Sequence, residues 1–147
     1  MDTPSTEPGP LGLILILLAL PLVFVGFWSA VCVMLSVVGG WSRLARRFAT
    51  DQPQPAGAQG SLGAMVGFVS YRGGVLEAGA APDGLDLRVM TLFRPGHRPL
   101  RIPWEQVEVQ GEGSFLFGRW TRLRLGGQAT LRIDSGLWAQ LANRAGR

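Results

Sequence analysis

The stretch that decides the architecture is LGLILILLALPLVFVGFWSAVCVMLSVV, which runs from Leu11 to Val38. Its 28 residues include no Asp, Glu, Lys or Arg, and about 20 apolar residues suffice to cross a hydrocarbon core of about 30 Å. Because backbone groups in lipid must be hydrogen-bonded internally, a single spanning segment must be a helix. The sequence therefore predicts one transmembrane helix over residues 11–40, after a short N-terminal tail of residues 1–10.

The apolar run is longer than a bilayer requires, and its surplus can be accommodated in several ways. It predicts a tilted helix, a kink at Pro21, or a last turn in the headgroup region. Gly26 and Ala30 form a small-xxx-small pair that would let two helices approach, so we consider a homodimer through this helix. A cleaved signal peptide is the alternative, but acidic Asp2 and Glu7 precede the run where a signal peptide carries cations.

Charge around the run predicts its orientation. The chain contains 14 arginines and no lysine, and no arginine precedes the apolar run, whereas Arg43, Arg46 and Arg47 follow it directly. Loops rich in cations remain on the cytoplasmic side, so we expect the N-terminus outside and the C-terminal part in the cytoplasm. The single cysteine, Cys32, excludes an intrachain disulfide and fits a reducing compartment.

Residues 41–50 predict a basic amphipathic segment at the membrane interface. Apolar side chains recur there at helical spacing, and the arginines lie elsewhere around the helix. Each arginine near an anionic leaflet contributes about 1 kcal/mol of binding free energy. The expected interface anchors are Trp41, Arg43, Arg46, Arg47 and Phe48. The next ten residues, 51–60, have the Pro and Gly content of an extended, poorly packed linker.

Residues 61–147 alternate between apolar and polar side chains, with Gly and Pro at short intervals. This pattern is typical of antiparallel β-strands. The alternation is clearest around residues 85–89, 100–104, 122–125 and 131–134, and further strands are expected at 64–71, 75–80 and 107–110, with a hairpin arm at 114–117. Turns are expected at Pro82-Asp83-Gly84, Gly111-Glu112-Gly113 and Gly126-Gly127. The sequence predicts about seven strands in one curved antiparallel sheet or barrel.

The end of the chain changes to helical periodicity. Ser135 is the expected N-cap, and Leu137, Trp138 and Leu141 form an apolar stripe after it. One terminal helix of this kind would close the open end of a curved sheet. The expected structural core includes Ile102, Trp104 and Trp138. The predicted fold class is therefore an N-terminal transmembrane helix followed by a small mainly-β domain with a C-terminal helix.

Three segments, at residues 84–87, 92–97 and 100–107, carry a resemblance to a known family. They read GLDL, LFRPGH and LRIPWEQV, and with the strands-then-helix order they resemble the pleckstrin-homology-like domains of the bacterial PH and GRAM type in small single-pass membrane proteins. The resemblance implies a location in the bacterial inner membrane, a non-catalytic binding or scaffold role, and no cofactor. It does not imply phosphoinositide binding, because the lipid-binding members use a basic loop between the first two strands, and the only basic residue of that turn here is Arg72.

The candidate contact site is the loop around FRPGHRP. We expect Arg94, His97, Arg98 and Arg101 to lie in a stiff exposed loop, which either is simply solvated or contacts headgroup phosphates or an acidic partner. Its partners would be membrane lipids and a membrane or cytoplasmic protein, and a lipid-sensing role for this loop is the alternative function. His97 is the only histidine, so no metal site and no acid–base pair can be assembled around it from the sequence.

The remaining arginines of the predicted strands raise a second question. Arg122, Arg124 and Arg132 should project from one outer face, where facing like charges cost stability. Glu105, Glu108 and Asp134 could neutralise them and make a mixed, solvated face, which is the interpretation we favour. Membrane tethering and the absence of a recognition motif argue against nucleic acid as a partner.

Overall fold

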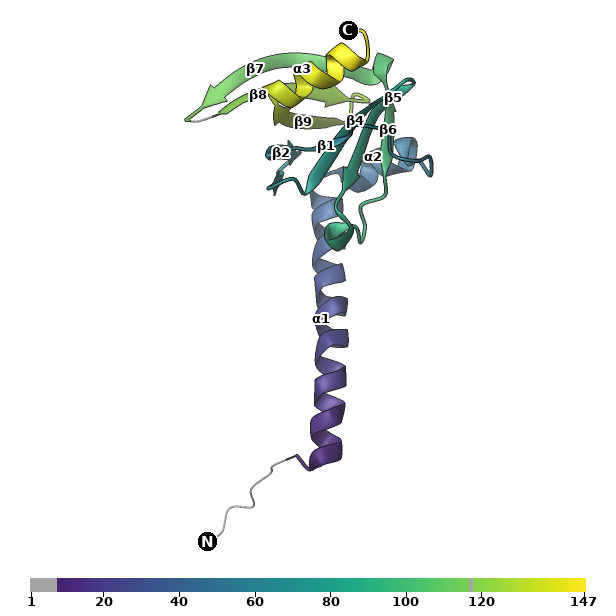
Figure 1. The fold of residues 1–147 in the computed structure, drawn as a ribbon, viewed down its shortest axis with the longest axis vertical. Helices are drawn as coiled ribbons and strands as arrows, with labels where there is room; N and C mark the ends of the chain where they lie inside the picture. The colour runs from purple at the N-terminus through teal and green to yellow at the C-terminus, as the bar shows by residue number, and fades with distance from the viewer. Residues whose placement is uncertain (1–7, 117) are drawn as a thin grey trace.

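The structure is a computed structural model that describes residues 8–116 and 118–147. Helix α1 (Pro10–Val38) forms a straight stem, and the remaining elements form a β domain at its C-terminal end (Figure 1). The helix is long and apolar enough to span a membrane and continues through Pro21. Residues 1–7 of the predicted tail, with Asp2 and Glu7, lie outside the described residues, as does Phe117 of the predicted hairpin arm.

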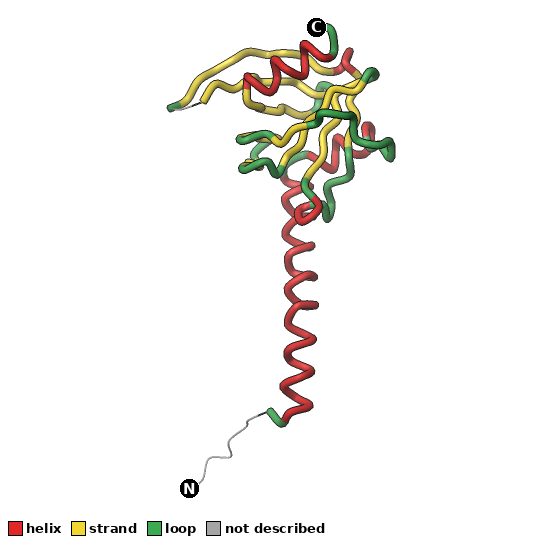
Figure 2. Tube along the Cα trace, in the orientation of Figure 1, coloured by secondary structure: helices red, strands yellow, loops and turns green. Residues whose placement is uncertain are grey.

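The nine strands of the described residues form two antiparallel sheets (Figure 2). The first has the order β1-β4-β5-β6 and the second the order β3-β2-β9-β8-β7. The strands are β1 (Gln59–Gly60), β2 (Gly63–Val66), β3 (Val69–Arg72), β4 (Leu76–Ala81), β5 (Gly84–Val89), β6 (Leu100–Pro103), β7 (Val107–Phe115), β8 (Gly118–Leu125) and β9 (Ala129–Asp134). The mainly-β domain and its C-terminal helix are as predicted, but the described strands form two sheets and no closed barrel.

Two details of the strand prediction were wrong. The segment expected as one strand at 64–71 is a hairpin of β2 and β3, because Gly67 adopts a positive φ of 57° and reverses the chain. Gly111 and Gly113 do not form a turn but lie within β7, whose register with β8 shifts between Val109 and Gly111. Gly113 is needed there because the ring of Trp120 lies against its backbone, where a Cβ would have no space.

Helix α2 (Trp41–Phe48) packs its apolar face into the β domain instead of lipid. Trp41 and Leu44 are fully buried, and Phe48 is nearly so. The indole nitrogen of Trp41 donates to the carbonyl of Arg98 at 2.9 Å. The expected membrane anchoring by Trp41 and Phe48 is therefore wrong, since an amphipathic face can be satisfied by a protein core as well as by a bilayer. The arginines of this helix, Arg43, Arg46 and Arg47, are exposed.

The segment 51–60 is mostly exposed, as expected of an extended linker, but hydrogen bonds tie it to the first sheet. Arg101 donates to the side chain of Gln52 and to the carbonyl of Pro53, and Arg88 donates to the carbonyl of Gln52. Strand β1 then pairs with β4. We call residues 51–55 the strap, because these bonds fasten them to β5 and β6.

Helix α3 (Ser135–Arg144) contributes the buried Leu137 and Leu141 to the core. Its N-cap is Asp134 and not Ser135, because the Asp134 carboxylate accepts from the backbone of Leu137 at 3.0 Å. Trp138 is only partly buried against the core, so it contributes less than expected. The burial of the other two predicted core residues is confirmed: Ile102 is fully buried, and Trp104 is buried with its indole nitrogen bonded to the carbonyl of Ala81.

Candidate functional site

The loop predicted as a contact site does not present its four residues together. His97 is only 2% exposed, because the ring of Trp41 from α2 and that of Tyr71 from β3 pack against it. The expectation of an exposed His97 is therefore wrong: the loop folds back under α2. Arg94 and Arg98 are exposed, and Arg98 lies 3.7 Å from the exposed carboxylate of Asp51.

The surroundings of His97 assign it a structural role. Its Nδ1 lies 3.2 Å from the carbonyl of Pro95, which can only accept, so the neutral ring carries its proton on Nδ1. Its Nε2 then accepts from the Tyr71 hydroxyl at 2.9 Å. Burial lowers the pKa of His97 and raises the pKa of Tyr71 to about 12, so both groups are neutral at physiological pH.

Arg101, the fourth member of the predicted loop, is used inside the domain. Its guanidinium donates to the Asp86 carboxylate at 2.9 Å, and Asp86 also accepts from Arg88 at 2.7 Å. Asp86 is 1% exposed, although the alternation of its strand predicts an outward side chain. Asp86, Arg88 and Arg101 form a buried triad, and its two arginines bind the strap. Because Arg101 is engaged in these bonds, it cannot reach a lipid or partner.

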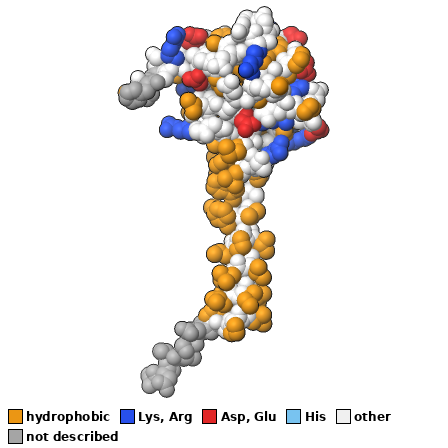
Figure 3. Space-filling view, in the orientation of Figure 1, with side chains coloured by type: hydrophobic (Ala, Val, Ile, Leu, Met, Phe, Trp, Pro, Cys, Tyr) orange, Lys and Arg blue, Asp and Glu red, His pale blue; other side chains and the backbone are white. Residues whose placement is uncertain are grey.

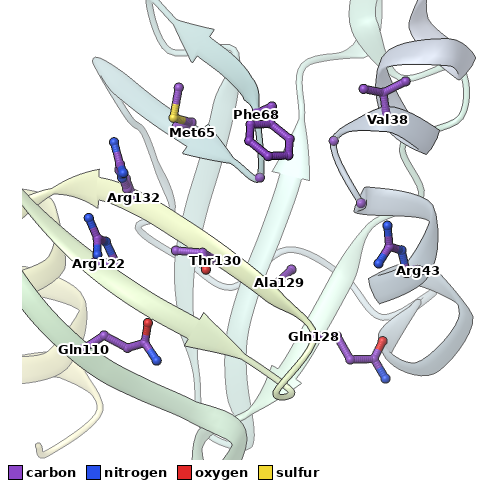
Figure 4. Close-up of a pocket in the computed structure, with 13 residues that line it drawn as sticks. Val38, Arg43, Met65, Phe68, Gln110, Arg122, Gln128, Ala129, Thr130 and Arg132 are labelled. Carbon is purple, nitrogen blue, oxygen red and sulfur yellow. The ribbon is translucent and has the colours of Figure 1, made fainter.

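A second cluster of arginines, which the sequence did not reveal as a site, lies between the second sheet and the corner where α1 ends and α2 begins. A hollow of about 430 Å³ is open there beside the end of α1. Figure 4 shows Arg122 and Arg132 on neighbouring strands at one end and Arg43 of α2 at the other, with Thr130 between them. We call this the basic hollow. Its remaining lining residues are Val38, Gly39, Gly40, Met65, Gly67, Phe68, Gln110, Gln128 and Ala129.

The charges in the basic hollow are not compensated by nearby carboxylates. Arg122 and Arg132 are direct cross-strand partners, and the ring of Trp120 lies 5.1 Å from each guanidinium. Such cation–π contacts are worth about 0.5–1 kcal/mol at exposed sites and only partly offset the repulsion between like charges. Within the described residues, no ion pair joins Arg122, Arg124 or Arg132 to Glu105, Glu108 or Asp134. Glu108 is the cross-strand partner of Arg124, so the mixed face that we favoured is present there, but it does not extend to Arg122 and Arg132 in the hollow.

Two further features make the basic hollow suited to a ligand. The Nε of Arg122 is buried and has no hydrogen-bond partner in the described part of the chain. Phe68, at the turn between β2 and β3, is 88% exposed at the rim. Arginine, methionine and aromatic side chains are enriched in protein interfaces, and arginine is among the residues that contribute most to their binding energy. An anionic group beside an apolar one would satisfy both parts of this surface.

Comparison with known proteins identified no relative. No family model, no curated protein and no solved structure matches this chain. What the protein does must therefore be argued from its own geometry. Among the described residues, no three His, Cys, Asp or Glu side chains gather as a metal site would require.

The residues of the basic hollow come from four stretches of the chain, 38–43, 65–68, 110 and 122–132. Arg43 belongs to α2, Phe68 to the first hairpin of the second sheet, Gln110 to β7, and the other two arginines to β8 and β9. The only signal in the sequence was the like charges expected on one face of two strands. Their convergence with Arg43 depends on how α2 folds back against the sheet.

Proposed function

We propose that this protein is a membrane-anchored, non-catalytic binding module that presents a PH-like domain at the cytoplasmic surface of the bacterial inner membrane. Helix α1 is the single-pass anchor, with its N-terminus outside, and the C-terminal domain carries the recognition surface. The cation asymmetry across α1 supports this orientation. The order of β-strands followed by one C-terminal helix supports the PH-like assignment.

The observation that carries the proposal is the basic hollow. Three guanidinium groups line it, none of its described lining residues is acidic, and exposed Phe68 forms part of the rim. The ligand that complements this surface is an acidic segment with an apolar side chain, carried by a membrane or cytoplasmic protein. Guanidinium groups recognise carboxylates through paired hydrogen bonds, which favours such a partner.

The proposal is tested by photo-crosslinking in native membranes. A photoreactive amino acid replaces Phe68 in the full-length protein, and adducts are analysed in this background and after Arg132→Glu or Arg43→Glu. Arg124→Glu is the matched control, because Arg124 lies on β8, on the same face as Arg122, and makes the same change of charge outside the hollow.

We expect one protein adduct that both hollow variants abolish and that Arg124→Glu retains. An adduct that survives both hollow variants would refute the basic hollow as the binding site. An adduct to lipid alone would assign the site to anionic headgroups.

Lipid sensing by the loop from Arg94 to Arg101 was the alternative function. The burial of His97 and the engagement of Arg101 by Asp86 leave only Arg94 and Arg98 exposed, which weakens that alternative. Self-association through Gly26 and Ala30 remains compatible with the proposal, because both are exposed on α1 and neither lines the hollow.

A further inference from the structure

The loop after β5 lies against the stem, and within it Phe93 also packs against the core of the domain. Residues 90–96, which we call the foot, include the short helix η1 (Thr91–Phe93) and run beside α1 (Figure 1). The indole nitrogen of Trp28 donates to the carbonyl of Leu92 at 2.9 Å, and its ring lies 5.3 Å from that of Phe93. One end of the β domain is therefore fixed to a position ten residues before the end of α1.

The close approach continues along the next two turns of α1. Gly96 has a positive φ of 76°, and a Cβ at this position would lie 2.9 Å from Cα of Val33. The hydroxyl of Ser36 donates to the carbonyl of Gly96 at 2.6 Å, and Cys32 is buried between the two bonded positions. The foot and the last turns of α1 thus form one packed unit.

The depth of the foot follows from helix geometry. A hydrocarbon core of about 30 Å takes about 20 residues at about 1.5 Å each, so a span that starts at Leu11 ends near Ala30. Trp28 then lies in the last turn of that span. If the whole run to Val38 is centred in the bilayer, Trp28 lies deeper still. Either placement puts Leu92 at or below the boundary of the hydrocarbon.

The side chains of the foot suit that position. Leu92 is 63% exposed and Met90 is also exposed. Figure 3 shows hydrophobic side chains along the whole visible surface of α1 up to the β domain. The foot contains no acidic residue, and its one charged group, Arg94, is exposed. An arginine at the edge of an apolar segment can reach headgroup phosphates while its neighbours lie in the hydrocarbon.

We propose that the foot inserts into the boundary of the bilayer, so that the protein meets the membrane at two places and not through α1 alone. The occupant of this apolar surface is lipid, because the surface continues that of the helix that spans it. The bonds of the foot to Trp28 and Ser36 keep the domain from rotating about α1, and insertion of the foot into lipid limits the tilt of the domain. The basic hollow, beside the C-terminal end of α1, is then held at a constant height and orientation above the membrane.

Depth-dependent fluorescence quenching tests this inference. In a Cys32→Ala background, Leu92→Cys is labelled with an environment-sensitive fluorophore, and the full-length protein is reconstituted in phosphatidylcholine–phosphatidylglycerol vesicles that contain lipids with a nitroxide near the top of the acyl chain. Leu116→Cys is the matched control, because Leu116 is a leucine that is more exposed than Leu92 and lies at the tip of the β7–β8 hairpin.

We expect the nitroxide lipid to quench the label at position 92 several-fold more than the label at position 116. Equal quenching at the two positions would overturn the inference. Met90→Cys repeats the test if Leu92→Cys disturbs the fold, which is checked by its thermal unfolding. Neither result depends on whether the basic hollow has a ligand.

Discussion

Replacing Asp86 by alanine should lower the free energy of unfolding of the domain far more than removing one exposed carboxylate would. Asp86 accepts hydrogen bonds from Arg88 at 2.7 Å and from Arg101 at 2.9 Å, and all three side chains are mostly buried. Removing it leaves two guanidinium groups in the domain without their carboxylate. Breaking a buried charge pair in this way costs about 3–5 kcal/mol. We take the lower end, because Arg101 retains the carboxylate of Asp83 at 3.6 Å.

A loss of about 3 kcal/mol corresponds to a fall in Tm of roughly 12–24 °C for a domain of this size. The assay is thermal unfolding of the full-length protein in detergent micelles, followed by near-ultraviolet circular dichroism. The control is Asp51→Ala, which removes a carboxylate that is 96% exposed and 3.7 Å from Arg98, and which should cost at most about 1 kcal/mol. Limited proteolysis should also cut within the strap in Asp86→Ala, because Arg88 and Arg101 hold it.

If Asp86→Ala and Asp51→Ala shift Tm by the same small amount, the buried triad does not hold the strap. The Tm of Asp86→Asn should lie between those of the two alanine variants, since asparagine preserves the volume of the side chain and loses the charge.

Three further predictions concern the stem, the buried histidine and the orientation. Gly96→Ala should lower Tm more than Gly73→Ala. Both glycines have positive φ, but only Gly96 approaches α1, while Gly73 faces open space. Equal shifts in Tm would contradict the packing of the foot against α1. His97 has a lowered pKa in the folded state, so the unfolded state binds more protons below about pH 6.5 and stability should fall as the pH drops from 7 to 5. His97→Gln should lessen that dependence, and an unchanged profile would show that another group titrates. A cysteine at exposed Gln128 should be protected from an impermeant reagent in spheroplasts and labelled only after lysis; labelling of intact spheroplasts would reverse the proposed orientation.

The sequence predicted the elements of this protein better than their contacts. The apolar run, the strands around residues 85–89 and 131–134, and the turns at 82–84 and 126–127 depend on local composition, and the structure contains them. The two-sheet arrangement depends on which strands pair, and local alternation carries no information about pairing.

The wrong side-chain assignments share one physical cause. Trp41 and Phe48 form an apolar stripe that either lipid or a protein core would bury, and the sequence cannot tell these environments apart. His97 has arginines and prolines as neighbours, which suggests exposure, yet Trp41 and Tyr71 cover it from distant elements. The candidate site was missed for the same reason, because Arg43 joins the strand arginines only after α2 has packed on the sheet.

The anchor, the foot and the placement of the domain all require that α1 lie in lipid, and extraction of membranes with alkaline carbonate tests this most directly. Full-length protein from gently lysed cells should remain in the membrane pellet after this treatment and be released only by detergent, because an apolar helix is stable only within lipid. Recovery of the intact chain in the carbonate supernatant would contradict the anchor, the inserted foot and the position of the basic hollow together.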